Sequence, residues 1–495
     1  MGTPPKRLHK VLVANRGEIA LRVIRACRAR GLFPVAIYSD ADRGALHVRA
    51  AAEAYRVGGP EPADSYLNIP AVVAAARRAG ADAVHPGYGF LSENPAFAEA
   101  CAQAGLIFVG PPAGVLAVCG DKAAARRRVA AGGVPVLPGT DPVDDRGALA
   151  AAARLGFPVL IKAAAGGGGK GIHRAARSED LPGALRLARS EARGAFGDDR
   201  VYLERWVERP RHIEVQIVAD DRESVIHLGE RECSIQRRHQ KLIEESPAPR
   251  LPAGIQEAIR NAATAAARAV GYRNAGTAEF LVSDGSFYFL EINARLQVEH
   301  PVTEMVTGCD LVALQLEVAS GAPLPFRQEQ IRLHGHAIEC RISAEDPENQ
   351  FLPWSGRIGQ VLLPGGPSIR VDGALAPGME ISRYYDPLLA KIIAWGSVRD
   401  EAIARMAAAL GETVVTEVPT TVPFHRWALA HPGFRAGEYD TRFVDVEWQG
   451  RAFPGGRLAA LAAAVLAYQE DRRPPILPPQ DPTGWIQAGR REGIA

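Results

Sequence analysis

Two lysines flank a run of glycines in the middle of the chain. Lys162 ends an apolar stretch, and Lys170 follows directly after the glycines 166–169. Backbone amides without a nearby Cβ atom, together with ammonium groups, are suited to binding phosphate. A Walker loop needs glycine at position 164 and serine or threonine at 171, but the sequence has Ala164 and Gly171. We therefore expect a phosphate site of another kind, in which the glycine run acts as a lid; a plain flexible loop is the alternative.

Two carboxylates and an amide lie on an expected β-hairpin. Glu279 is in its first strand, and Glu291 and Asn293, two residues apart, share one face of its second strand. A two-residue turn would send Glu291 to the face opposite Glu279, whereas a three-residue turn at 284–286 would place the two acids opposite each other. We expect the three-residue turn. Oxygen ligands of this kind suit Mg²⁺ or Mn²⁺ on phosphate better than zinc, and an exposed charged strand face is the alternative.

Polar residues continue directly after this hairpin. Arg295, Gln297 and Glu299 place a cation, an amide and a carboxylate beside the expected metal ligands. These residue types suit anion binding combined with proton transfer. The cationic segment 237–241 and the strand 212–216, whose polar residues share one face, are expected to complete the site.

Alternating strand and helix signals supply the scaffold in the N-terminal region. Strands are expected at 10–14, 35–39, 54–57 and 83–85, and helices at 18–30 and 69–79. This alternation predicts a parallel α/β layer in the first ~115 residues. The turn at 15–18 has one glycine where a dinucleotide fingerprint needs three, so we expect it to serve as scaffold.

Proline and glycine residues divide the rest of the chain. They mark a boundary at 111–114 and a linker at 323–325. Between these points we expect strands at 158–163, 172–175 and 211–218, and the glycine run joins the first two. Residues 334–440 mix short strands with a helix at 399–410. An Ala/Leu helix and a Pro-rich tail end the sequence.

Composition excludes several classes of protein. A chain of 495 residues with 47% hydrophobic residues should fold into about three domains rather than stay disordered. Its net charge of +2 argues against a nucleic-acid or membrane surface, and its longest apolar run, 458–468, is too short to span a bilayer. Six widely spaced cysteines without a Cys-x-x-Cys pair suggest reduced thiols and a cytoplasmic location.

Six segments of this sequence resemble biotin carboxylase, the ATP-grasp component of biotin-dependent carboxylases. They are ANRGEIA (14–20), HPGYGFLSEN (85–94), GDK (120–122), CSIQRRHQK (233–241), EINARLQVEHPVTE (291–304) and ECRI (339–342). The resemblance covers residues 11–443, and it implies an α/β and α+β protein with a parallel α/β domain at 1–117, an ATP-grasp domain at 118–325 with a lid at about 135–205, a mixed α+β domain at 334–443, and a tail at 444–495.

The resemblance also implies a role for each candidate site residue. ATP would be bound by Lys122, Lys162, Gly168, Gly169, Glu204, Arg205, Trp206, Val207, His212, His239, Glu279 and Glu291. Its Mg²⁺ or Mn²⁺ ions would be held by Glu279, Glu291 and Asn293. Bicarbonate would be held by Lys241, Arg295, Gln297 and the backbone at Val298, with Glu299 as the base and Arg341 in contact with biotin. Arg205 departs from the family, which often has lysine there.

The same resemblance implies partners in other chains. None of the four methionines adjoins a lysine, so the Met-Lys-Met biotin attachment site is missing and biotin is expected on a separate carrier protein. A carboxyltransferase subunit is expected in trans, and a homodimer is expected from family membership. The alternatives are another ATP-grasp ligase that uses a different acid, and a nucleotide-binding regulatory subunit without turnover.

Overall fold

The computed structural model describes residues 7–164 and 171–450. The described residues up to Gln449 belong to one compact unit. Gly168, Gly169 and nearly all of the expected tail lie outside the described residues. Within the described ranges, every helix is either too short or too polar to cross a lipid bilayer.

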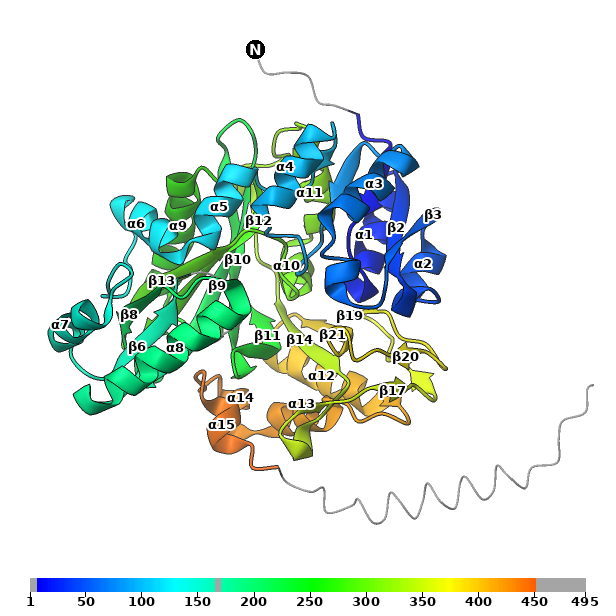
Figure 1. Ribbon diagram of the computed structural model, residues 1–495. Coiled ribbons are helices and arrows are strands. Elements are labelled where there is room, and N and C mark those ends of the chain that lie inside the picture. The colour runs from blue at the N-terminus through cyan, green and yellow to red at the C-terminus, as the bar shows by residue number, and fades with distance from the viewer. Residues whose placement is uncertain (1–6, 165–170, 451–495) are drawn as a thin grey trace, which may run out of the picture. The chain divides into compact units, whose positions relative to one another are not determined.

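The N-terminal region is a parallel sheet covered by helices on both faces (Figure 1). Its strand order is β3-β2-β1-β4-β5, from β1 (Lys10–Val13), β2 (Phe33–Ser39), β3 (Glu53–Gly58), β4 (Ala83–His85) and β5 (Ile107–Phe108). Val11 and Val13 pack with α1 (Gly17–Ala29), whereas Leu12 packs with α3 (Ile69–Ala79). Successive side chains of β1 point to opposite faces of the sheet, and helices cover both faces. The residues 11–13 of β1 are therefore all apolar.

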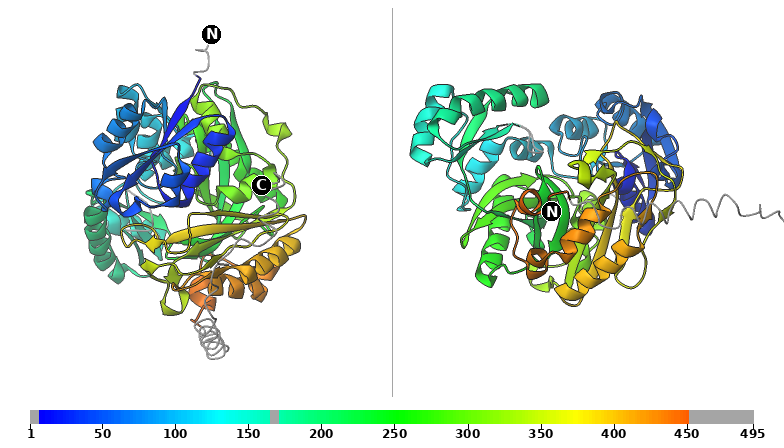
Figure 2. Two further views of the ribbon diagram at one scale, coloured as in Figure 1. Left: turned by 90° about the vertical axis from the view of Figure 1, so that its right-hand side faces the viewer. Right: turned by 90° about the horizontal axis from the view of Figure 1, so that it is seen from below.

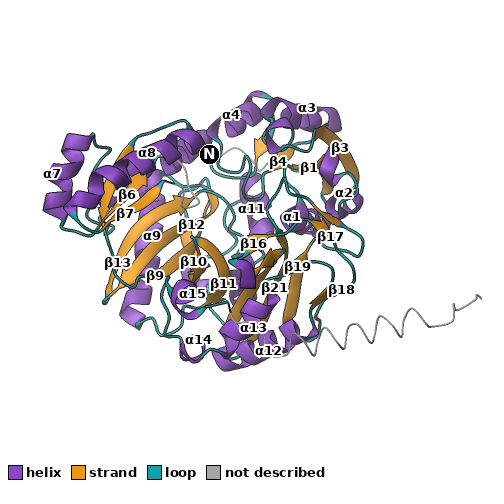
Figure 3. Ribbon diagram, turned by 60° about the horizontal axis from the view of Figure 1, so that its bottom comes forward, coloured by secondary structure: helices purple, strands orange, loops and turns teal. Residues whose placement is uncertain are grey.

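An eight-stranded antiparallel sheet forms the centre of the molecule (Figure 3). Its order is β13 (Ser286–Asn293), β12 (Asn274–Ser283), β9 (Arg211–Ala219), β10 (Val225–Arg237), β11 (Gln240–Ser246), β14 (His336–Ser343), β21 (Leu388–Gly396) and β19 (Ile369–Gly373). Ile243 on β11 pairs with Cys340 on β14, so the sheet continues across the linker expected at 323–325. The central and C-terminal regions therefore share one sheet.

Helices cover the two halves of this sheet. The half that contains β9 packs on α9 (Ala253–Val270), and the half that contains β21 packs on α12 (Arg399–Glu412). A short helix, α10 (His300–Thr307), lies against β10, β11, β14 and β21. The other helices and short strands are α2 (Leu46–Ala50), α4 (Pro95–Gln103), α5 (Ala113–Gly120), α6 (Lys122–Ala131), α11 (Leu311–Ala319), α13 (Val422–Ala430), α14 (Pro432–Ala436), α15 (Phe443–Glu447), β15 (Glu345–Asp346), β16 (Leu352–Pro353), β17 (Gly356–Arg357), β18 (Val361–Leu362), β20 (Glu380–Ile381) and β22 (Val414–Val415).

A second, three-stranded sheet contains the strands on either side of residues 165–170 (Figure 2). Its order is β7-β6-β8, from β6 (Val159–Ala163), β7 (Ile172–Ala175) and β8 (Val201–Arg205), with α7 (Asp145–Leu155) and α8 (Leu181–Phe196) packed on it. β6 and β7 are antiparallel neighbours. The glycines therefore join two adjacent strands, as expected.

The turn of the acidic hairpin was predicted wrongly, although the acids lie opposite each other. Ser283 pairs with Ser286, so the turn has two residues rather than three. A bulge follows, because Phe280 pairs with Phe289 but Glu279 pairs with Glu291. The extra residue, Leu290, shifts the register by one and returns Glu291 to the face of Glu279.

One ion cluster ties the central sheet to the C-terminal helices. Glu245 on β11 accepts hydrogen bonds from His336 on β14 (2.6 Å) and Arg399 on α12 (2.7 Å). Burial alone would raise the pKa of Glu245, but these hydrogen bonds outweigh it and lower the pKa to about 2.

This shift makes the stability depend on pH. A carboxylate with a lowered folded-state pKa stabilises the protein above its unfolded pKa, and the effect is lost as pH falls through the folded pKa. We expect Glu245→Gln to lower the free energy of unfolding by about 3 kcal/mol at neutral pH. The difference in the free energy of unfolding between this variant and wild type should narrow as pH falls from about 4.5 toward 2. Urea denaturation across this range measures it, and a cost independent of pH would contradict the assignment.

Candidate active site

A cavity of about 1090 Å³ collects most of the candidate residues. Its size suits a nucleotide and a small second substrate. The candidates that line it are Lys122, Lys162, Arg205, Trp206, Val207, His212, His239, Lys241, Glu279, Glu291, Asn293, Arg295, Gln297, Val298 and Arg341. Glu204 and Glu299 are buried just behind this lining, where they pair with lining residues.

The alternation of β9 explains why polar groups face the cavity. Ile213, Val215 and Ile217 pack into the core under α9. His212, Glu214 and Gln216 must then point to the opposite face. His212 Nε2 lies 3.0 Å from Glu279 Oε2 on the neighbouring strand. Polar residues on one face of this strand were expected, and the structure confirms that arrangement.

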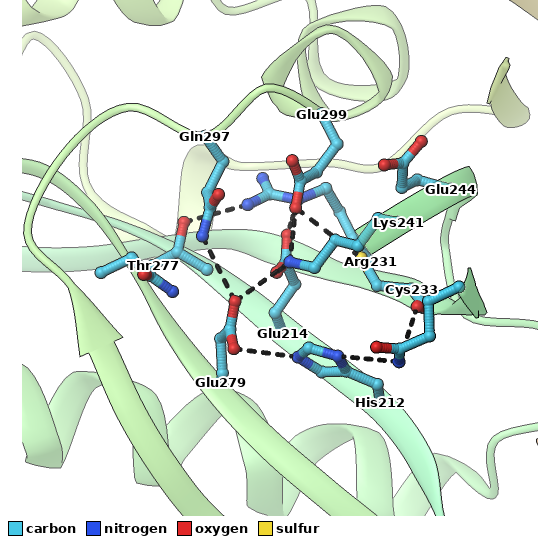
Figure 4. A network of polar contacts seen from close by, with 12 residues as sticks. His212, Glu214, Arg231, Cys233, Lys241, Glu244, Thr277, Glu279, Gln297 and Glu299 are labelled. Atoms are coloured by element: carbon cyan, nitrogen blue, oxygen red, sulfur yellow. Dashed lines mark hydrogen bonds and ion pairs between the residues drawn. The ribbon is translucent and has the colours of Figure 1, made fainter. Parts of the chain in front are cut away.

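Lys241 lies at the centre of a carboxylate cluster (Figure 4). Its Nζ is 2.5 Å from Glu214 Oε2, 3.0 Å from Glu279 Oε1 and 2.6 Å from Glu299 Oε1. Burial would lower the pKa of Lys241, but these three carboxylates raise it well above its ordinary value. Glu214 and Glu279 are direct partners across β9 and β12. Because like charges so placed repel each other, the ammonium between them stabilises the pair.

Glu299 is fully buried between two cations. Lys241 contacts one of its oxygens, and Arg341 Nη2 lies 2.8 Å from the other. Burial would raise the pKa of Glu299, but Lys241 and Arg341 hold it well below its ordinary value. The carboxylate is therefore ionised at neutral pH and able to accept a proton.

Arg341 is oriented by a second acid. Its guanidinium also contacts Glu244 Oε1 on the adjacent strand, at 2.6 Å from Nε. Burial is the largest influence on Glu244 and raises its pKa to about 7, against the opposing effect of Arg341. Arg341 therefore lies between two acids while remaining on the cavity wall.

Arg295 and Gln297 form an adjoining polar group. Arg295 Nη1 donates to Gln297 Oε1 at 2.9 Å, and Gln297 Nε2 lies 3.3 Å from Glu279 Oε1. Glu93 of the N-terminal region accepts from Arg295 Nε and from the backbone N–H of Ala294, both at 2.9 Å. Glu93 thus anchors the loop after β13 to the N-terminal layer. Glu279 connects this loop to Lys241, because it contacts both Gln297 and Lys241.

Two further lysines that line the cavity, Lys122 and Lys162, each pair with a glutamate. Lys122 at the start of α6 lies 2.8 Å from Glu291, and Lys162 on β6 lies 2.5 Å from Glu204 on β8. Ammonium groups at these positions, next to the strand end from which the glycine run begins, suit the phosphates of a nucleotide.

Three side chains with oxygen donors lie at neighbouring positions on β12 and β13. Glu279 and Glu291 face each other across β12 and β13, and Asn293 lies two residues along the same strand. Both acids already pair with cationic side chains, Glu279 with Lys241 and His212, and Glu291 with Lys122. Opposed carboxylates of this kind favour positive charge between them, and hard oxygen donors suit Mg²⁺ or Mn²⁺.

Several residues of the network were missed from the sequence. They are Glu93, Arg231, Glu244 and Lys391, while Glu214 was noted only as part of a polar face. A signal existed for two of them: Arg231 and Lys391 are charges inside strands that are otherwise well buried. Arg231 is fully buried, and its Nε lies 2.5 Å from Glu214 Oε1. A charge at such a position requires a partner.

Three family models together match most of the chain. Residues 7–116 match the biotin carboxylase N-terminal domain, and residues 339–446 match the biotin carboxylase C-terminal domain. Residues 121–327 match the ATP-binding domain of the carbamoyl-phosphate synthase L chain. The chain belongs to the biotin carboxylase family. The expected family, the fold class and ATP-dependent carboxylase activity are thereby confirmed.

Relatives in this family match the chain over most of its length. A pyruvate carboxylase subunit of Methanothermobacter thermautotrophicus is 48% identical over 487 residues, which is 94% of this chain and 99% of the relative. Biotin carboxylase 1 of Bacillus subtilis is 50% identical over 442 residues, 88% of this chain and 98% of the relative.

Solved structures of biotin carboxylases are also similar to this chain. The β,γ-ATP complex of the Campylobacter jejuni biotin carboxylase has a TM-score of 0.87 and 44% identity, covering 89% of this chain and 99% of that one. The biotin carboxylase domain dimer of Hydrogenobacter thermophilus 2-oxoglutarate carboxylase, in complex with MgADP, ADP and bicarbonate, has a TM-score of 0.88 and 45% identity, covering 90% and 99%.

Proposed function

We propose that this chain carboxylates biotin on a separate carrier protein, using ATP and bicarbonate, as the first half-reaction of a biotin-dependent carboxylase. The observation that carries the assignment of roles is the buried carboxylate of Glu299 between Lys241 and Arg341, which we take as the base. This base lies in the same network as Arg295 and Gln297, through Glu279.

Bicarbonate is held by cationic and amide groups of β11 and of the loop after β13. Arg295, Lys241 and Gln297 supply charge and hydrogen bonds, and the backbone N–H of Val298 completes the set. ATP and bicarbonate repel each other, and a unit charge pair at 4 Å is worth ~1 kcal/mol in water but ~4 kcal/mol at an effective dielectric of about 20. A closed cavity with several cations is therefore needed to bring them together.

ATP occupies the end of the cavity that carries Lys122 and Lys162. Its adenine end lies toward Arg205, Trp206 and Val207, with Glu204, His212, His239 and the glycines 168 and 169 as further contacts. Mg²⁺ or Mn²⁺ on Glu279, Glu291 and Asn293 would neutralise phosphate charge.

Glu299 accepts the bicarbonate proton on its carboxylate. The bicarbonate oxygen then attacks the γ-phosphorus, the bond from that phosphorus to ADP breaks, and carboxyphosphate forms. Carboxyphosphate breaks down to CO₂ and phosphate. Phosphate removes the proton from the ureido nitrogen of biotin, Arg341 stabilises the resulting enolate by its charge, and the nitrogen captures CO₂.

Other chains complete the proposed enzyme. We propose that a biotin carrier protein and a carboxyltransferase act with this chain, which is supported by the relative that is one subunit of a pyruvate carboxylase. We propose a homodimer, which is supported by the domain dimer of the Hydrogenobacter relative. We also propose a cytoplasmic location, supported by six free cysteines, five of them buried. The acceptor differs between relatives, pyruvate for one and 2-oxoglutarate for another, so no single acceptor is assigned to this chain.

The test is ATP cleavage that depends on bicarbonate and is stimulated by free biotin. The purified chain is assayed for ADP release with Mg²⁺, with and without each substrate. We expect little release without bicarbonate and a further increase with biotin. ATP binding without turnover would favour a regulatory role, and cleavage indifferent to bicarbonate would favour a ligase for another acid.

A further inference from the structure

A lysine is fully buried in one of the most apolar strands of the sheet. Lys391 lies in β21, whose sequence is LLAKIIAWG, and its side chain has no exposed surface. A buried ammonium is costly unless charged or polar partners surround it. Neither ATP nor bicarbonate binding, as proposed above, gives Lys391 a role.

The partners of Lys391 come from two distant regions of the chain. Its Nζ donates to the carbonyl oxygen of Val298 at 2.7 Å and lies 3.3 Å from Glu18 Oε1. Glu18 is in the first turn of α1, and the same oxygen accepts a hydrogen bond from the Tyr88 hydroxyl. Helix α1 packs against β19 and β21, and the views agree that these elements lie side by side (Figures 1 and 2).

The carbonyl that Lys391 holds lies at a sensitive point of the site. It belongs to the peptide that joins Val298, proposed to offer its N–H to bicarbonate, to the base Glu299. This loop lies between β13 and α10, outside the ladder of either element. Its carbonyls therefore depend on individual partners. The His300 ring meets the carbonyl of Gln297 at 2.8 Å, and Lys391 supplies the partner for the next one.

We propose that Lys391 is a positioning residue that fixes the backbone between Val298 and Glu299 for bicarbonate, and that Glu18 holds its ammonium in place. This inference rests on the proposed function. It also gives Glu18 a function, whereas the sequence alone predicted only a scaffold role for the turn 15–18. Through Glu18 and Lys391, the N-terminal layer reaches the bicarbonate loop.

The first test is Lys391→Met in the full chain. Loss of one charge-assisted hydrogen bond to the loop should raise the KM for bicarbonate by about 10-fold to 100-fold. The KM for ATP should stay within about twofold, because the residues at the phosphate end do not contact Lys391. A purely structural loss would reduce the folded fraction and leave both KM values unchanged, which would overturn the proposal.

Lys10→Met is the matched control. Lys10 also pairs with one carboxylate, Glu53 at 3.0 Å, and one backbone carbonyl, that of Ala79 at 2.9 Å. Neither partner lines the cavity. We expect neither KM to change, so a rise in the bicarbonate KM in this variant as well would remove the support for a specific role of Lys391.

Glu18→Gln keeps the proposal testable if Lys391→Met does not fold. The amide retains the shape of Glu18 but removes its charge, so we expect a smaller rise in the KM for bicarbonate and again no change for ATP. An unchanged bicarbonate KM would overturn the role of Glu18.

Amide hydrogen exchange separates this inference from the proposed function. Residues 296–300 should exchange faster in Lys391→Met or Glu18→Gln than in wild type, and Lys10→Met should match wild type. If wild type showed no bicarbonate-dependent cleavage, the proposed function would fail, yet the exchange rates would still decide whether Lys391 holds the loop. Equal exchange in all variants would overturn the proposal whatever the activity.

Discussion

Arg295→Ala should reduce bicarbonate-dependent ATP cleavage by at least 10²-fold to 10³-fold, the usual cost of removing one electrostatic group from a reaction site. The guanidinium is partly buried against Glu93 and Gln297 and supplies positive charge where two anions must approach each other. Steady-state ADP release at saturating ATP, with bicarbonate varied, measures the loss.

Arg43→Ala is the control for this variant. Arg43 is largely exposed and pairs only weakly with Asp40, at 3.3 Å. An exposed pair of this kind contributes little, so cleavage should be close to wild type. Equal losses in the two variants would argue against a specific role for Arg295.

Glu299→Gln should lower the same rate by about 10²-fold to 10⁴-fold, the range typical of a lost general base. The amide fills the same space but accepts no proton. Because Lys241 and Arg341 hold the pKa of Glu299 well below its ordinary value, the wild-type base stays ionised as pH falls from about 8 to 6. Corrected for the bicarbonate present at each pH, the wild-type rate should show no loss from this group.

Glu230→Gln gives a matched control for the buried charge. Glu230 is also fully buried and ion-paired, with Arg260 at 2.6 Å, but Arg260 does not line the cavity, whereas the partners of Glu299, Lys241 and Arg341, do. We expect this variant to lose stability while each folded molecule keeps its rate. A Glu299→Gln enzyme as active per folded molecule as Glu230→Gln would show that Glu299 is not the base.

Local sequence patterns were sufficient to predict most of the helices and strands that we expected. The apolar run at 10–14 became β1, and the helical spacing at 69–79 became α3 with the expected bounds. Both depend on periodicity within one element, which the sequence displays directly. The acidic hairpin shows where this stops, because its register depends on a turn and a bulge together. The predicted turn was one residue too long, but the bulge at Leu290 restored the predicted pairing of Glu279 with Glu291.

Contacts between distant segments could not be predicted in the same way. Segments that resemble the family identified Arg295, Glu299 and Arg341, but nothing in the sequence joins Glu93 to Arg295 or Glu18 to Lys391. These pairs lie about 200 and 370 residues apart, and they form only when the N-terminal layer packs against the sheet. The roles of the candidate site residues themselves remain predictions for the experiments above.

The backbone pairing of β11 with β14 determines what would happen if the chain were cut between these strands. Residues 243–246 pair with 337–340, so a single cut in the connecting stretch around 323–325 would not by itself separate the two pieces. They would stay associated through main-chain hydrogen bonds. If either piece were made alone, it would carry an open strand edge, the kind of surface on which chains stack and aggregate.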